Sequence, residues 1–207
     1  MATEQFTIRP ATTDDDPAIA GLVVEGFIDK FRPIFGEQGD QSLRIMEKWV
    51  ELEHSVGGVR SLVIEGASPQ DLAAGVGVRV EKSLDEVLAR DLWRVLQQNL
   101  GLLKSLWAST LLSYPRYTTR PAEAYIERLV VSPDYRRQGM ARDLLAAAEE
   151  LARERGKKDA GLHVSGNNAP AIKLYEAEGY EEVSRQRSFL TSHFLGIRDW
   201  IYLRKTL

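Results

Sequence analysis

The 207-residue sequence contains no cysteine. Disulfide scaffolds, zinc–thiolate sites and cysteine nucleophiles all need thiols, so all three are excluded. Only three histidines are present, and they are too scattered to show metal-ligand spacing: His54, His163 and His193. We therefore predict no metal, and we expect His163 to be a core residue on a strand.

Long apolar runs and a strong net charge are also missing. No apolar run is long enough to cross a bilayer, and residues 1–5 lack the basic and apolar regions of a secretory signal. The formal net charge is −3, so no global cationic field would attract nucleic acid or anionic lipid. A hydrophobic content of 43% is sufficient for a real core. We expect one cytoplasmic domain spanning 1–207, without a membrane span or a nucleic-acid partner.

The most distinctive segment is 126–142. It begins with an apolar run typical of a buried strand, which comprises Leu129, Val130 and Val131. A turn at 132–134 and a loop with cationic and glycine character follow, and a helical pattern begins near Ala141. This order predicts an anion-binding site, because the first helical N–H groups lack intrahelical partners and the helix dipole adds positive potential. Gly139 allows a ligand close to the backbone, and nearby arginines suit phosphate oxygens: Arg136, Arg137 and Arg142.

The remaining patterns predict an α/β protein. Strands are expected near 6–10, 59–65, 73–80, 124–131, 161–164, 180–189 and 199–205. Helices are expected from Thr12 onward, at 42–53, in two pieces within 83–113, at 143–155 and at 168–178. We expect 31–36 to break the first helix, Ser83 to Glu86 to form a capping box, and Asn168 to be an N-cap.

The segment 83–113 is rich in leucine and tryptophan. One interpretation is a helical hairpin packed on the core, since apolar stripes usually face a core. The other is a wall or lid over an acceptor pocket, or a subunit contact that would permit a homodimer.

Two blocks resemble the GCN5-related N-acetyltransferase (GNAT) family. Arg136-x-x-Gly139-x-Ala141 after a strand is similar to the acetyl-CoA loop of that family. The second block matches the family's strand–helix–strand element at Asn168, Ala171, Leu174, Tyr175, Gly179 and Tyr180. The resemblance covers about 124–185 and extends to 5–82. It does not cover 83–120, which is interpreted as a helical insertion between strands 3 and 4.

The resemblance implies a GNAT fold, with a central mixed, mostly antiparallel twisted sheet of about seven strands flanked by helices. It implies acetyl-CoA as cosubstrate, with the pyrophosphate on backbone amides of Arg137, Gln138, Gly139, Met140, Ala141 and Arg142. The pantetheine arm would lie along strand 4, which is splayed from strand 5 in the family, and pair with Leu129 and Val131. A strand-4 amide, assigned to Leu129, would donate to the thioester carbonyl. Further cofactor contacts are expected from Val130, Arg136 and Asn168.

The resemblance also implies catalytic roles. Tyr175 matches the family tyrosine that protonates the departing CoA thiolate, and a neutral phenol is a competent donor. Glu127 is our candidate base for the acceptor amine, with an ion-paired strand glutamate as the alternative. Tyr125 on the same face could act through water. The absence of cysteine favours direct attack in a ternary complex, and Ser132 and Ser165 are interpreted as structural.

The acceptor remains open between a small-molecule amine and a protein amine, which would be a lysine or an N-terminus. A different class of function is a non-catalytic acyl-CoA-binding or regulatory module of the same fold. A nucleotide-binding module is disfavoured, because the loop lacks the Lys-Ser/Thr of a phosphate loop and the glycine set of a dinucleotide fold.

Overall fold

The computed structural model describes residues 6–36, 39–68, 71–80 and 85–207. In this part of the chain, seven strands form one sheet in the order β1-β2-β3-β4-β5-β7-β6. Their bounds are β1 (Ile8–Pro10), β2 (Val59–Glu65), β3 (Leu72–Arg79), β4 (Glu123–Val131), β5 (Asp159–Ser165), β6 (Glu181–Arg187) and β7 (Asp199–Thr206). Only the β4–β5 pair is parallel among these strands. The predicted mixed, mostly antiparallel sheet is confirmed.

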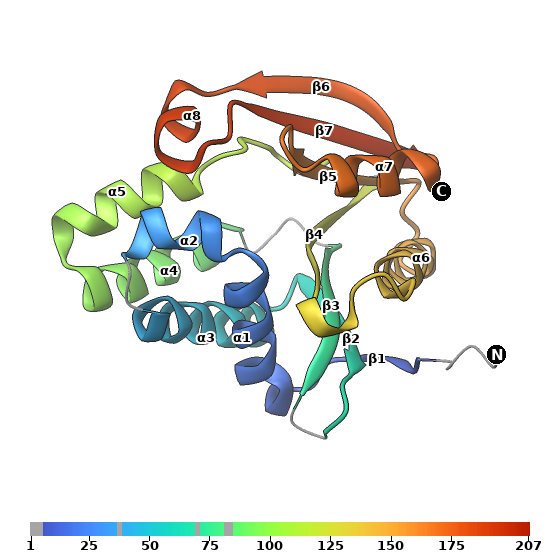
Figure 1. Ribbon diagram of the computed structural model, residues 1–207, viewed down its shortest axis with the longest axis horizontal. Helices are drawn as coiled ribbons and strands as arrows, with labels where there is room; N and C mark the ends of the chain where they lie inside the picture. Colours follow the sequence, from blue (N-terminus) through green and yellow to red (C-terminus); the bar gives the residue numbers. More distant parts are fainter. Residues whose placement is uncertain (1–5, 37–38, 69–70, 81–84) are drawn as a thin grey trace.

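Helices cover both faces of this sheet (Figure 1). In the described residues they are α1 (Asp16–Gly26), α2 (Ile28–Phe35), α3 (Gly39–Val56), α4 (Asp85–Leu100), α5 (Leu102–Leu112), α6 (Met140–Glu154), α7 (Ala169–Ala177) and α8 (Phe189–Leu195). Helices α1 to α5 gather on one side of β4 and α6 lies on the other (Figure 1). None of the described helices is both long and apolar enough to span a membrane.

The alternation of side chains along β2 separates two apolar cores. Leu62 and Ile64 pack in a core with residues of α6, whereas Val63 points to the opposite face and packs with residues of α1 and α3. Successive strand residues point to opposite faces, so a strand covered on both sides must be apolar throughout. The all-buried pattern of Leu72 to Val78 in β3 has this origin.

The segment between β3 and β4 forms the predicted pair of helices. Leu96 on α4 and both Ala108 and Leu111 on α5 are buried in the core that includes α1 and α3. The helical hairpin packed on the core is therefore the better of the two interpretations, although Pro115 just after α5 does reach a cavity described below. The predicted capping box begins within 81–84, outside the described residues.

Two expectations for the helices were wrong. The segment 31–36 was expected to break the first helix, but α1 ends at Gly26 and α2 continues to Phe35. Pro33 is tolerated because it removes only the bond to the carbonyl of Asp29, which is an exposed residue at the helix start. No helix was predicted between the last two strands, where α8 begins at the N-cap Ser188.

The two central strands separate beyond their first residues. β4 and β5 are paired only from Glu123↔Asp159 to Ile126↔Leu162. On its other side, β4 is bulged against β3 at Arg128, whose φ is 54°. Because β4 pairs on one side only after Ile126, its backbone groups facing β5 are outside the ladder and accessible to a ligand. This opening positions the candidate site.

Candidate active site

The loop before α6 has the shape of an anion cradle. Gly139 is the N-cap of α6 and adopts φ 90°, a left-handed conformation that favours glycine. Arg137 is also left-handed, at φ 67°. The amide of Arg142 donates to the carbonyl of Gly139 at 2.9 Å, so it is already engaged in the first turn. The amides of Met140 and Ala141 precede it and have no intrahelical acceptor, which leaves them directed toward a ligand.

The three arginines of this loop are held in different ways. The Arg136 Nε donates to the carbonyl of Val131 at 3.3 Å, and the Arg142 Nε pairs with Glu178 Oε1 at 2.5 Å. Arg137 has no side-chain partner among the described residues. An incoming anion can therefore bind the unpaired guanidinium of Arg137 directly. To bind the other two guanidinium groups, it would compete with their contacts to Val131 and Glu178.

A cavity of about 670 Å³ adjoins the cradle. Its walls come from the open edge of β4, the loop, the first turn of α6 and one side of α7. Of the predicted cofactor residues, those that line it are Leu129, Val130, Val131, Arg136, Arg137, Gly139, Met140, Ala141, Arg142 and Asn168. Gln138 is exposed and does not line it. We name this the donor cavity.

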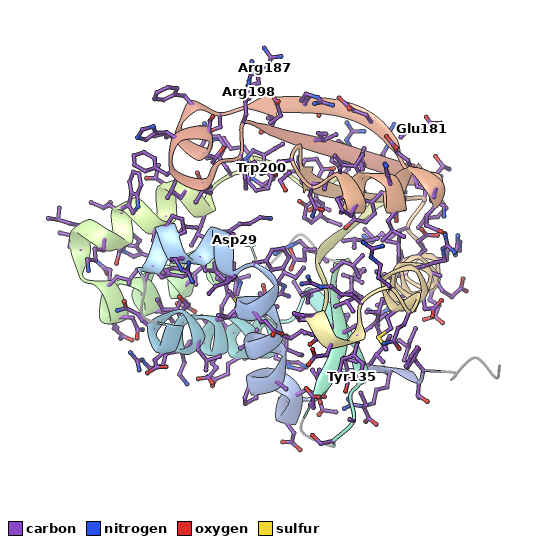
Figure 2. The ribbon with its side chains drawn as sticks, in the orientation of Figure 1. Asp29, Tyr135, Glu181, Arg187, Arg198 and Trp200 are labelled. Carbon is purple, nitrogen blue, oxygen red and sulfur yellow. The ribbon has the colours of Figure 1, made fainter. Side chains whose placement is uncertain are left out.

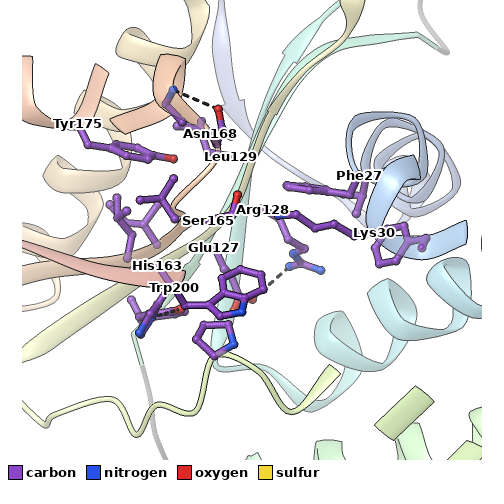
Figure 3. A pocket seen from close by; sticks show the side chains of 18 of the residues that line it. Phe27, Lys30, Glu127, Arg128, Leu129, His163, Ser165, Asn168, Tyr175 and Trp200 are labelled. Atoms are coloured by element: carbon purple, nitrogen blue, oxygen red, sulfur yellow. Dashed lines mark hydrogen bonds and ion pairs between the residues drawn. The ribbon is translucent and has the colours of Figure 1, made fainter. Parts of the chain in front are cut away.

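A second cavity of about 290 Å³ lies on the other side of the opening (Figure 3). Its polar lining includes Glu127, Arg128, His163 and Lys30. Its apolar walls come from α1, α2, α3 and β7, and comprise Val23, Phe27, Phe31, Met46, Trp49 and Trp200. Trp200 points from β7 toward α2, whereas Arg187 on β6 points away from the molecule (Figure 2). We name this the acceptor cavity.

The two cavities share Tyr175 and the strand residue Leu129, together with Phe27, Asn168 and Ala171. Tyr175 is 8% exposed, and its hydroxyl points into the space facing Phe27 and Lys30 (Figure 3). Burial raises the pKa of Tyr175 to about 12, so the phenol is protonated at neutral pH. Among the described residues this hydroxyl has no hydrogen-bond partner. It can therefore donate a proton to an atom placed between the cavities.

Glu127 belongs to a cluster of charges behind the acceptor cavity. Its Oε2 lies 3.2 Å from Arg79 Nη2, and its Oε1 lies 3.4 Å from Arg128 Nη2. Arg128 also pairs with Glu53 Oε2 at 2.5 Å. Glu127 Oε1 is buried and has no hydrogen-bond partner in the described chain. The ion-paired alternative is thus observed, because both oxygens of Glu127 lie at ion-pair distance from an arginine, while Oε1 accepts no hydrogen bond in the described chain.

Burial disfavours the charged forms of these side chains, and pairing with opposite charges favours the charged forms again. Burial raises the pKa of Glu53, which is opposed by Arg128 and by the hydrogen bond that Trp49 Nε1 donates at 2.7 Å. Burial alone would lower the pKa of Arg128, but the carboxylates of Glu53 and Glu127 raise it. Because buried charges are stable only when they are paired, this arrangement holds Glu127 in a defined position.

His163 was expected to be a core residue, but it lines the acceptor cavity. Its Nδ1 lies 2.9 Å from the Tyr125 hydroxyl, and its Nε2 is buried without a hydrogen-bond partner in the described part of the chain. Burial lowers the pKa of His163 to about 4. The ring packs against Tyr202, with centroids 5.0 Å apart, which fixes its orientation. Sequence reasoning also missed Lys30 and Trp200, which carry no motif.

The lowered pKa of His163 predicts a pH-dependent stability. Between pH 6.5 and 4 the unfolded chain protonates this ring while the folded chain does not, so folding loses stability as the pH falls. His163→Gln replaces the ring by a side chain that does not titrate in this pH range. Between pH 7 and pH 4.5, we expect the free energy of unfolding of wild type to fall by about 2 kcal/mol more than that of the variant. This figure allows for partial screening by solvent. Denaturant unfolding at both pH values measures this, and parallel pH curves would contradict it.

Comparison with known proteins agrees with this geometry. A model of the acetyltransferase (GNAT) family matches residues 101–180. A crystal structure of an acetyltransferase superposes with a TM-score of 0.66 at 25% identity, over 97% of this chain and 98% of its own. Residues 101–180 thus match the GNAT family, and the chain shares its fold with a solved acetyltransferase.

Other acetyltransferases match smaller parts of the chain or resemble its fold. The [ribosomal protein bS18]-alanine N-acetyltransferase of Escherichia coli (strain K12) is 39% identical over 67 residues, which are 32% of this chain and 45% of that protein. The match thus spans less than half of this curated relative. An N-acetyltransferase from Thermoplasma acidophilum, in complex with coenzyme A, has a TM-score of 0.59 at 13% identity, covering 98% of this chain and 99% of its own. The GNAT family is a family of acyltransferases. Among the described residues, no group of three or more His, Asp or Glu could hold a metal.

Proposed function

We propose that this protein is an acetyl-CoA-dependent N-acetyltransferase that transfers the acetyl group to an amine by direct attack in a ternary complex. The observation that carries the proposal is the meeting of the donor and acceptor cavities at Leu129 and Tyr175. A thioester entering from one side and an amine entering from the other would react at this point without a covalent enzyme intermediate.

The donor side fits the diphosphate of coenzyme A. The amides of Met140 and Ala141 and the guanidinium of Arg137 would bind its oxygens, and Gly139 would allow their close approach. The open edge of β4 would receive the pantetheine arm as an added strand. A β4 amide, assigned to Leu129, would stabilise the oxyanion that forms on the thioester carbonyl.

The acceptor side provides the proton transfers. A protonated amine cannot attack, because its nitrogen has no free lone pair. Glu127 Oε1 is buried at this wall, accepts no hydrogen bond among the described residues, and would take the proton from the amine. The nitrogen attacks the thioester carbon, which forms the C–N bond and a tetrahedral oxyanion. The carbonyl re-forms as the C–S bond breaks, and the sulfur leaves as a thiol with the proton of Tyr175.

The experiment that tests the function is release of free CoA thiol from acetyl-CoA in the presence of amines. The panel should include small amines and a peptide that begins with alanine, because the Escherichia coli relative is named for an alanine of ribosomal protein bS18. We expect amine-dependent thiol release. Binding of acetyl-CoA without release for any acceptor would instead favour the non-catalytic acyl-CoA-binding module.

Replacement of Glu127 by glutamine tests its role as the base. We expect kcat/KM for the preferred amine to fall by roughly 100-fold, with a larger loss at lower pH, where fewer amines are already neutral. The matched control is His163→Gln, which replaces the other side chain of the same wall that has a buried polar atom without a hydrogen bond in the described chain. With a pKa of about 4, His163 is a weak base, so this variant should retain most of the activity.

Pre-steady-state and steady-state rates between pH 6 and 10 would measure both variants, after thermal melting has shown that each is folded. A Glu127→Gln profile parallel to that of wild type would remove Glu127 from the proton transfer and leave its ion pairs with Arg79 and Arg128 as its role.

A further inference from the structure

Lys30 extends from α2 into the acceptor cavity, opposite Tyr175 (Figure 3). Its Nζ lies 4.7 Å from the ring centroid of Phe27 and 5.3 Å from that of Trp200. These two rings belong to α1–α2 and β7, so the ammonium group lies between opposite walls of the cavity. Cation–π contacts of this kind stabilise the charge only in part. Burial accordingly lowers the pKa of Lys30 to about 8.

The carboxylates near Lys30 are already used by other cations. Glu53 pairs with Arg128, and Glu127 pairs with both Arg79 and Arg128. Lys30 has no carboxylate at ion-pair distance within the described ranges. Both carboxylates that line this cavity are thus engaged by arginines, and Lys30 is its one lining cation without an ion pair among the described residues. His163 is neutral at pH 7 and adds no charge.

The carboxylates farther out do not pair with Lys30 either. Asp199, next to Trp200 in the chain, pairs with Arg187 at 3.3 Å. Asp29, next to Lys30, is exposed. Lys30 is therefore a partly desolvated cation without an ion pair, and it is directed toward the space that an acceptor would occupy. A ligand anion would restore the interaction that this ammonium lost when it was buried.

We propose that Lys30 binds a carboxylate of the acceptor, and that the acceptor is a small amine that carries both a carboxylate and an apolar or aromatic group. This inference rests on the proposed function and names the substrate class of the same site. The volume of about 290 Å³ lies at the small end of ligand pockets. The apolar group would contact the rings of Phe31, Trp49 and Trp200, which line the same space. Lys30 is thus a specificity-determining residue.

The test compares amino acids with their amides, which differ only in the charge that Lys30 would bind. Phenylalanine, tryptophan and leucine would each be assayed beside their amides as acceptors. We expect Lys30→Met to lower kcat/KM at least 10-fold for the carboxylates and less than 2-fold for the amides, while Lys30→Arg retains most of the preference. Comparing each ligand between proteins cancels the difference in amine pKa between an acid and its amide.

The matched control is Lys48→Met. Lys48 is an exposed lysine on α3 that pairs with Glu51 at 2.7 Å, outside both cavities. It should change kcat/KM for neither member of any pair. Equal losses for acids and amides in Lys30→Met would show that Lys30 only supports packing of Phe27 and Trp200, and would overturn the proposal.

A second measurement does not depend on turnover. Calorimetry with CoA present would compare N-acetylphenylalanine with its amide on wild type and Lys30→Met. We expect the acid to bind at least 10-fold more tightly than the amide to wild type, and equally to the variant. Such discrimination without any acetyl transfer would support the anion site and refute the proposed function. Transfer without discrimination in either assay would support the function and refute the anion site.

Discussion

Replacing Gly139 by glutamate is expected to abolish the binding of acetyl-CoA. Gly139 has φ 90° and ψ −13° as the N-cap of α6, a conformation in which a side chain is strained. A glutamate would also place a carboxylate where the cradle offers N–H groups and Arg137 to a diphosphate. Repulsion between anions and loss of space act together, so we expect affinity to fall by at least roughly 100-fold, which corresponds to about 2.7 kcal/mol.

Two control variants separate these causes. Gly139→Ala introduces the backbone strain with little bulk and no charge, because a Cβ at this position meets only Asp143 Oδ2, at 3.9 Å. Gly156→Glu introduces the same charge at φ 70°, at the other end of α6, where a Cβ meets nothing within 4 Å. Calorimetry should find acetyl-CoA affinity nearly unchanged in Gly156→Glu and intermediate in Gly139→Ala. Unchanged affinity in Gly139→Glu would refute the cradle.

The parts of the site that the sequence predicts are those built by neighbours in the chain. Gly139 precedes a helix, and the Asn168 side chain accepts from the amide of Ala171 at 3.3 Å, as expected of an N-cap. The loop of 133–142 and the helix α7 each derive their shape from local caps, turns and apolar periodicity. Ten of the eleven residues predicted for the cofactor therefore line the donor cavity, and Gln138 does not, whereas Gly26, Phe27 and Tyr135 line it without having been predicted.

The acceptor cavity could not be predicted in this way, because its walls come from distant segments. Lys30 and Trp200 are brought together by the packing of α2 near β7, and neither belongs to a motif. Arg128 adopts a left-handed conformation in a bulge, although its residue type gives no sign of it. Its pairing with Glu53 on α3 is a further long-range contact. Such contacts follow from the tertiary structure, and no local signal in the sequence indicates them.

The helix α8 is a different case, because a local signal was present. The Ser188 side chain accepts from the amide of Thr191 at 3.2 Å, and Gly196 ends the helix at φ 66°. A serine and a glycine at this spacing are ordinary start and stop signals. With seven residues, however, the helix is too short to show a clear 3.6-residue periodicity. It contributes indirectly to the acceptor cavity, since Trp200 Nε1 donates to Thr191 Oγ1 at 3.1 Å.

The phenol of Tyr175 is expected to be the group whose removal slows the chemical step most. Tyr175→Phe should lower kcat by roughly 100-fold or more, the usual range for loss of a general acid. The acetyl-CoA affinity should change by less than about 3-fold, because the ring that lines both cavities is retained. Since burial raises the pKa of Tyr175 to about 12, the phenol stays protonated, and its deprotonation should not reduce wild-type turnover below pH 10.

The matched control is Tyr180→Phe. Tyr180 is 2% exposed, its ring centroid lies 6.0 Å from that of Tyr175, and it lines neither cavity. Loss of this neighbouring hydroxyl should leave kcat within about 3-fold of wild type, so a large effect confined to Tyr175→Phe would be chemical and not a consequence of repacking. Equal turnover of Tyr175→Phe and wild type, in single-turnover assays at saturating amine, would exclude the phenol as proton donor to the leaving thiolate. A donor from solvent would then have to reach the sulfur through the opening between β4 and β5.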